Sequence, residues 1–111
     1  MIELNLLDAR IIQIVKYIQV NFSQDFFKIV DYWDGDLCAI GLQHEDKLIY
    51  ISTYLMRSDE NGAITYYSEF ELIDLATLET KAQVNTFTMI TKEKLLIEIK
   101  SFFKDAGEPI Q

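Results

Sequence analysis

The side chains of this sequence that could do chemistry are mostly carboxylates, since it holds 18 Asp and Glu residues but one histidine, His44, and one cysteine, Cys38. The densest acidic stretch consists of Asp31, Asp34, Asp36, Glu45 and Asp46. A calcium loop needs oxygen ligands at alternate positions of about 12 residues and a bidentate Glu at its end, and this spacing is absent. Asp34-Gly35 has instead the composition of a two-residue hairpin turn. The sequence therefore predicts no metal and no cofactor.

Catalysis by His44 or Cys38 would require a nucleophile and a base within hydrogen-bond distance of each other. The two residues stand on one extended segment, which at about 3.3 Å per residue puts them about 20 Å apart. Glu69 and Glu71 fall on one face of a predicted strand and resemble the carboxylate pair of a glycoside hydrolase in residue type only. A solvated or partner-facing strand explains them better. The four glycines are scattered, so no phosphate loop is present. We expect that the protein is not an enzyme.

The negative charge is unevenly placed along the chain. Residues 1–79 contain 14 Asp and Glu against 5 Lys and Arg, a net charge of -9, whereas residues 80–111 contain 4 against 5, a net charge of +1; the sum is -8. Nucleic-acid binding needs clustered Lys and Arg to neutralise phosphate, and anionic membranes attract basic segments. The acid excess argues against both of these partners and favours a basic protein.

Hydrophobic periodicity predicts a single α+β domain over residues 1–111, in which residues 107–111 form a mobile tail. The expected helices are 6–20 and 92–105, and the expected strands are 26–33, 36–42, 47–56, 63–73 and 80–89. The order is an N-terminal helix, an antiparallel meander of four to five strands, and a C-terminal helix. Asn5 and Thr91 are suited to cap the two helices, and Asn21 to end the first.

Turns at Asp34-Gly35 and Glu45-Asp46, and a pairing of Leu55 with Ile64 in the next hairpin, fix which strand residues lie opposite each other. The expected neighbours are Trp33 with Asp36, Ile29 with Ile40, Leu42 with Ile49, Ile40 with Ile51, Leu55 with Ile64, and Ile49 with Phe70. One face of the sheet then becomes apolar, and its members are Phe27, Ile29, Ile40, Leu42, Ile49, Ile51, Leu55, Ile64 and Phe70. We expect both helices to pack mainly on this face, because each apolar surface needs a partner.

The opposite face collects aromatic and polar side chains: Lys28, Tyr32, Leu48, Tyr50, Ser52, Tyr54, Thr65, Tyr67, Glu69 and Glu71. Tyrosine offers a large contact area with a hydroxyl group, and neighbouring acids offer charge-assisted hydrogen bonds to Lys or Arg of a partner. With the acidic turns, this predicts a partner-binding surface of Trp33, Asp34, Asp36, Glu45, Asp46, Tyr50, Tyr54, Tyr67, Glu69 and Glu71. Two structural explanations stay open: Tyr–Tyr pairs occur on ordinary sheets, or a helix covers part of this face.

The sequence also bears on where the protein works. A single cysteine cannot form an intrachain disulfide, which favours a reducing compartment. The first residues lack the basic start and the cleavage site of a signal peptide. The longest apolar runs are a few residues, far below the roughly 20 needed to cross a bilayer. We expect a soluble, cytoplasmic protein.

The layout resembles small bacterial immunity proteins, in particular those of contact-dependent growth inhibition systems. The resemblance lies in the opening helix IIQIVKYIQV, the meander DYWDGDLCAIGLQHEDKLIYISTYL, the strand ITYYSEFELI and the closing helix TKEKLLIEIKSFF. It covers most of the chain. It implies a cytoplasmic protein, monomeric or a weak dimer, that neutralises a cognate basic toxin domain of nuclease type by covering its active site or a nearby surface.

Two other functions stay open at this stage. Secretion or assembly chaperones are also small, acidic α+β proteins, and they usually dimerise and offer apolar grooves to a client segment. A small enzyme or ligand-binding protein would use a pocket between the sheet and the helices. The absence of His, Cys and Gly motifs argues against this last possibility.

Overall fold

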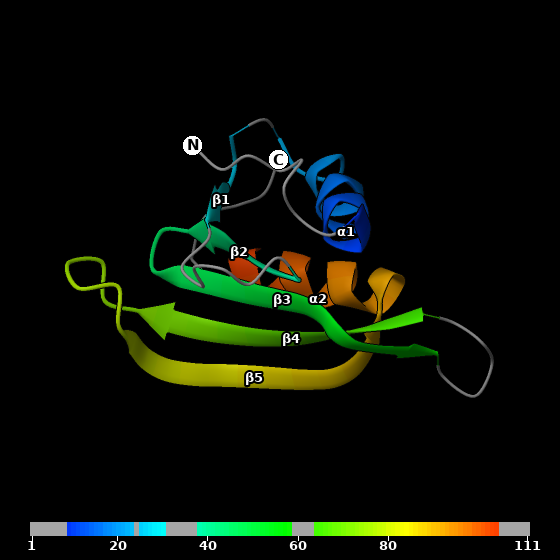
Figure 1. Cartoon of the computed structure of the whole chain (residues 1–111). Coiled ribbons are helices and arrows are strands. Elements are labelled where there is room, and N and C mark those ends of the chain that lie inside the picture. The colour runs from blue at the N-terminus through cyan, green and yellow to red at the C-terminus, as the bar shows by residue number, and fades with distance from the viewer. Residues whose placement is uncertain (1–8, 24, 31–37, 59–63, 105–111) are drawn as a thin grey trace.

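The chain forms an antiparallel sheet with one helix before it and one after it (Figure 1). The computed structural model describes residues 9–23, 25–30, 38–58 and 64–104, and for residues 54–58 the backbone alone. The elements are α1 (Ala9–Gln19), β1 (Lys28–Val30), β2 (Ala39–His44), β3 (Lys47–Ser58), β4 (Ile64–Ile73), β5 (Thr80–Thr91) and α2 (Lys92–Lys104). The strands lie in the order β1-β2-β3-β4-β5. The predicted α+β class and the helix–meander–helix order are confirmed.

Each of the two predicted helices buries one apolar stripe. In α1 the buried residues are Ile11, Ile14, Val15 and Ile18, and in α2 they are Leu95, Ile99, Phe102 and Phe103. Thr91 Oγ1 accepts a hydrogen bond from the Lys94 backbone N–H at 3.5 Å, as expected of an N-cap. Asn21 Nδ2 donates to the Tyr17 carbonyl at 2.9 Å and satisfies a free group at the end of α1. The proposed cap Asn5 lies outside the described residues.

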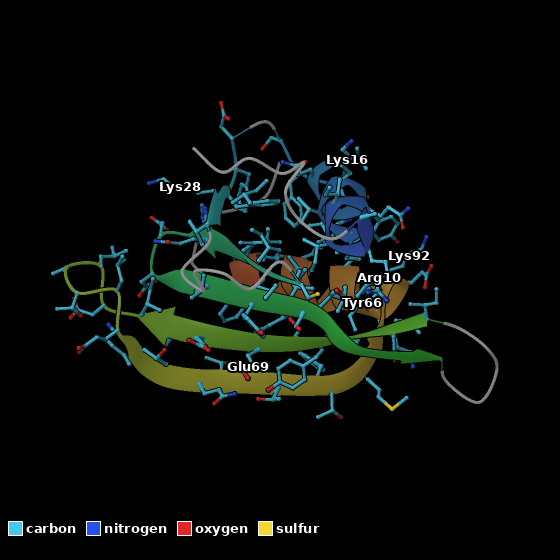
Figure 2. The ribbon with its side chains drawn as sticks, in the orientation of Figure 1. Arg10, Lys16, Lys28, Tyr66, Glu69 and Lys92 are labelled. Atoms are coloured by element: carbon cyan, nitrogen blue, oxygen red, sulfur yellow. The ribbon has the colours of Figure 1, made fainter. Side chains whose placement is uncertain are left out.

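Both helices pack on one face of the sheet. A single core cluster joins the stripes of α1 and α2 to Ile40, Leu42, Ile49, Ile51 and Phe70 from the central strands. Phe27 and Ile29 are partly buried against this cluster. Tyr66 of β4 is also buried there, beside Arg10 of α1 (Figure 2). Seven of the nine residues expected on the apolar face therefore contact the core as predicted.

The strand register is largely the predicted one. Leu42 pairs with Ile49, Ile40 with Ile51, and Ile49 with Phe70. The turn at Glu45-Asp46 is also confirmed, with Glu45 in the left-handed region at φ 54°. The pairing of Ile29 with Ile40 is wrong, because Ile29 pairs with Leu42. A shift of two residues leaves each side chain on the expected face, so the error does not change the core.

The expected pairing of Leu55 with Ile64 is wrong. The register between β3 and β4 shifts between Ser52 and Arg57, and Ile64 pairs with Ser58. Such a bulge adds residues to one strand, whereas the prediction assumed that residues of the two strands pair one to one without interruption. Ile64 is 51% exposed and lies outside the core. The side chain of Leu55 lies outside the described residues, as does the Trp33–Asp36 pair.

The edge strand β5 carries three register shifts against β4. In each, β5 supplies the extra residue: for example, the neighbours Phe70 and Glu71 pair with Asn85 and Gln83. Bulges twist an edge strand and interrupt its row of hydrogen-bonding groups, which protects the edge from pairing with another chain. The strand extends to Thr91, two residues beyond the expected end at residue 89.

Phe103 lies at the centre of an aromatic group on the face of the sheet that the helices cover. Its ring is fully buried, and the ring centroids of Phe26, Phe27 and Phe22 lie 5.8, 6.0 and 6.0 Å from it. This group joins the chain between α1 and β1 to the end of α2. The helix end therefore holds the first strand in place through side-chain packing.

We predict that Phe103→Ala lowers the free energy of unfolding by about 3–5 kcal/mol, because it leaves a cavity among rings that cannot all move inward. Urea denaturation followed by circular dichroism measures this. Ile97→Ala, on the 64% exposed side of the same helix, is the matched control and should change stability by no more than about 0.5 kcal/mol. Equal losses in both variants would show that Phe103 does not anchor the core.

Candidate functional site

Four of the predicted partner-binding residues lie together on the face of the sheet opposite the helices. Because side chains alternate along a strand, burial of Ile49 and Ile51 turns Tyr50 outward, and burial of Phe70 turns Glu69 and Glu71 outward. Tyr50 pairs with Glu69 across β3 and β4. Figure 2 shows Glu69 on the side of the sheet away from α2. We name the group Tyr50, Tyr67, Glu69 and Glu71 the outer-face cluster; all four side chains are partly exposed.

Direct contacts hold the outer-face cluster together. The Tyr67 hydroxyl donates a short hydrogen bond to Glu69 Oε2. The rings of Tyr50 and Tyr67 meet edge to face, with centroids 6.1 Å apart and an interplanar angle of 76°, a favourable aromatic geometry. At the other end, Thr80 Oγ1 donates to Glu71 Oε1 at 2.6 Å. These contacts fix the side chains before any partner arrives.

The acids of the cluster raise the pKa values of neighbouring groups. The hydrogen bond to Glu69, followed by burial and the nearby negative charge, raises the pKa of Tyr67 to about 12. Burial, together with the neighbouring Glu69, raises the pKa of Glu71 above its usual value, although the hydrogen bond from Thr80 opposes this. Two carboxylates close together favour a cation between or beside them. A Lys or Arg side chain of a partner would supply it.

The outer face is not open over its whole width. Leu48, Ser52 and Thr65, which were expected on it with the tyrosines, are buried. Leu48 and Ser52 flank Tyr50 along β3, and Thr65 precedes Tyr67 by two residues on β4, whereas both tyrosines stay partly exposed. The open part of the face is therefore the outer-face cluster itself.

The other predicted residues lie elsewhere. Glu45 and Asp46 form the β2–β3 turn, where the Asp46 carbonyl accepts from the Ile73 backbone N–H at 2.8 Å. They line a hollow of about 440 Å³ with Ile73 and the β4–β5 loop. This places them at one end of the sheet, outside the outer-face cluster. Trp33, Asp34 and Asp36 lie outside the described residues, and the same holds for the side chain of Tyr54.

Sequence reasoning missed two features of this region. Thr80 was expected only as the first residue of a strand, yet it binds Glu71. The loop between β4 and β5, residues 74–79, was not considered, although it follows Glu71 closely. The available signal was two leucines, Leu75 and Leu78, in a short connection that also holds Asp74, Thr77 and Glu79.

His44 has a structural role. It ends β2, and its ring stacks on Phe26 with centroids 4.2 Å apart. Nδ1 lies 2.8 Å from the Phe26 carbonyl, so this nitrogen carries the proton and donates it. Nε2 is buried, 3.6 Å from Glu45 Oε1. This arrangement fixes the loop before β1 to the sheet, and all of these contacts serve the fold.

The remaining surface features bear on other functions. Within residues 9–23, 25–30, 38–58 and 64–104, no group of three or more His, Cys, Asp or Glu side chains could hold a metal ion. In the same part of the chain, no helix is long and apolar enough to cross a membrane. A hollow of about 570 Å³ lies between β5 and α2, and its lining includes Phe87, Met89, Ile90 and Ile97 with Lys94 and Glu98. This lining is mainly apolar.

The raised pKa of Tyr67 predicts a measurable titration. In the folded chain Tyr67 should titrate near pH 12, and Glu69→Gln should move the midpoint towards the usual value near 10, because a neutral acceptor holds the proton less strongly. Since the folded pKa is raised, the stability that the pair contributes is present below about pH 10 and is lost as the pH rises towards 12.

NMR of tyrosine Cζ carbons measures this titration. Tyr66 is the internal control, because burial is the main cause of its raised pKa and the charged neighbours acting on it are Glu93 and Arg10. Glu69→Gln should leave Tyr66 unchanged. An identical Tyr67 midpoint in both proteins would show that the hydrogen bond to Glu69 is not formed in solution.

Comparison with known proteins identifies no relative: no family model matches the chain, and neither a curated protein nor a solved structure is significantly similar to it.

Proposed function

We propose that this protein is a cytoplasmic immunity protein that binds a basic toxin domain of nuclease type and blocks its activity. The observation that carries the proposal is the hydrogen-bonded pair Tyr67–Glu69, which lies with Tyr50 and Glu71 on a sheet face opposite both helices. Aromatic rings with fixed carboxylates beside them are suited to a protein partner that presents Lys and Arg side chains.

The charge of the chain supports the same proposal. A nuclease must attract phosphate, so the surface around its active site is positive. An inhibitor with a net charge of -8 gains association rate from electrostatic steering towards that surface. In this proposal the inhibitor needs no cofactor and performs no catalysis, because occupation of the surface is enough to exclude the substrate.

Preorganisation supports the choice of the outer-face cluster as the centre of the contact. Binding costs free energy when flexible side chains must be ordered, about 0.5–1.5 kcal/mol for each. Tyr67 is already held by Glu69, and Glu71 by Thr80. A partner cation would therefore meet acids that are already in position, and it would relieve the repulsion between them.

One observation favours the alternative of a secretion or assembly chaperone. The hollow between β5 and α2 has an apolar lining, and Met89 and Ile97 beside it are exposed. A client segment could bind there. Size-exclusion chromatography with light scattering separates the two functions in part, since an obligate dimer favours the chaperone.

We predict that Glu69→Lys combined with Glu71→Lys slows association with the cognate toxin domain by roughly 10- to 100-fold at low salt and weakens its salt dependence. The probe is the purified C-terminal domain of the protein encoded by the neighbouring upstream reading frame, and surface plasmon resonance gives the rates. Pull-down with the same domain first tests whether the two proteins bind.

The matched control is Glu93→Lys combined with Glu98→Lys on α2, which changes the net charge by the same amount at a distant site. Its association rate should remain well above that of the Glu69, Glu71 variant. If neither the rate nor the salt dependence changes in the Glu69, Glu71 variant, the outer face is not the binding surface. If both variants slow equally, net charge alone drives association.

A further inference from the structure

The β4–β5 loop, residues 74–79, presents two leucines to solvent. Leu75 is 60% exposed and Leu78 is 45% exposed. The loop projects beyond the end of the sheet (Figure 1). Scattered apolar residues are normal on a surface, but two leucines in one six-residue connection form a small apolar tip.

The loop is tightly hydrogen-bonded. The Asp74 N–H donates to the Glu79 carbonyl at 2.9 Å, and the Leu78 N–H donates to the Asp74 carbonyl at 2.7 Å. Asp74 Oδ1 accepts from the N–H groups of Ala76 at 2.8 Å and Thr77 at 3.1 Å. These two bonds lower the pKa of Asp74 below its usual value. The leucines are thus held outward by a fixed backbone, so little ordering would be required on binding.

Leu78 occupies a backbone conformation that suits another residue type. Its φ is 64°, in the left-handed region that glycine and asparagine adopt more easily than a bulky residue. Burial does not compensate for this, since nearly half of the side chain is exposed and it is not part of the core cluster. A strained residue that contributes no packing suggests a function for its side chain.

The groups that border the apolar tip are mainly acidic. On one side Glu79 is followed by Thr80, whose hydroxyl binds Glu71 of the outer-face cluster. On the other side Leu75 lines the same hollow as Glu45, Asp46, Asp74 and one cation, Lys81, so acids outnumber cations in this lining. Apolar anchors within a polar rim are the usual anatomy of a protein interface. The acidic rim is complementary to a partner whose apolar pocket is bordered by Lys or Arg.

We propose that Leu75 and Leu78 form a second contact with the same basic partner, and that they insert into an apolar pocket of that protein while Glu71 and the acids around the loop meet its cations. This inference rests on the proposed function and extends its interface from the outer-face cluster to the end of the sheet. It also assigns a role to Glu45 and Asp46, which belong to the rim of the tip.

Leu78→Gly tests the proposal, because it removes the side chain and relieves the backbone. The melting temperature should stay the same or rise, by up to about 4 °C, while the affinity for the upstream-encoded toxin domain falls at least 10-fold. Calorimetry gives both quantities. Leu78→Asn, which also tolerates this conformation and carries a polar side chain, should behave in the same way. Val20→Ala, which follows α1 and is 81% exposed, is the control for an exposed apolar residue elsewhere and should leave the affinity unchanged.

Each other outcome overturns the inference in a different way. Unchanged affinity of Leu78→Gly, combined with loss of binding in the Glu69, Glu71 variant, would exclude the loop and leave the proposed function in place. A lower melting temperature together with weaker binding would show that Leu78 serves the fold. A concentration-dependent dimer of the wild-type chain that Leu78→Gly abolishes would make a second copy the occupant. If the wild-type chain does not bind the toxin domain, the proposed function fails, and the inference fails with it.

Discussion

The shared apolar core between the sheet and its two helices is the constraint on which the rest of the structure depends. The apolar stripes of the helices and the apolar face of the sheet are stabilised by leaving water. They cover each other completely at their centre, where Phe103, Ile99, Ile49 and Ile51 are fully buried. Strand alternation carries this constraint through the sheet. Each side chain that enters the core turns its neighbours outward, so packing of Ile49 and Phe70 places Tyr50, Glu69 and Glu71 on the opposite face. The candidate binding surface is a consequence of the core.

A buried cation fixes one end of this arrangement. Lys47, the first residue of β3, is buried, and its Nζ donates to the Phe102 carbonyl at 2.6 Å and lies 4.9 Å from the centroid of the Phe102 ring. Burial of a charge is costly unless it is hydrogen-bonded. Here the free carbonyls and the negative dipole end of α2 supply the compensation. The contact ties α2 to the β2–β3 turn, and the Asp46 carbonyl in turn holds Ile73. The end of the sheet that carries the acidic turn and the β4–β5 loop is thereby held in place.

Much of this could be predicted from sequence, because the informative patterns are local. Helical spacing predicted both helices, and the Glu45-Asp46 turn gave the pair Ile40–Ile51. The pair Ile49–Phe70 was predicted from the pairing of Leu55 with Ile64; it is correct although that pairing is wrong, because the register shift lies beyond Ser52. What failed depends on the shape of the whole sheet. The bulge between Ser52 and Arg57 moved Ile64 out of the core. The pairing of Thr80 with Ile73, next to which Thr80 binds Glu71, depends on a β4–β5 loop whose ends the sequence did not define. The positions of bulges depend on the twist of the whole sheet and on its packing. The alternation of apolar and polar residues along one strand does not contain that information.

Two local features of the chain oppose its own stability, and both lie beside β4. The carboxylates of Glu69 and Glu71 are neighbours on one face, and burial with this proximity raises the pKa of Glu71. Leu78, five residues after the end of β4, has a left-handed backbone conformation and is nearly half exposed. Packing of the core requires neither the acidic pair nor the backbone conformation of Leu78. Neutral residues on the strand and glycine in the loop would make the fold more stable. A cation would relieve the first and an apolar pocket would cover the second. A single partner surface that offers both would account for their position on one continuous region of the molecule.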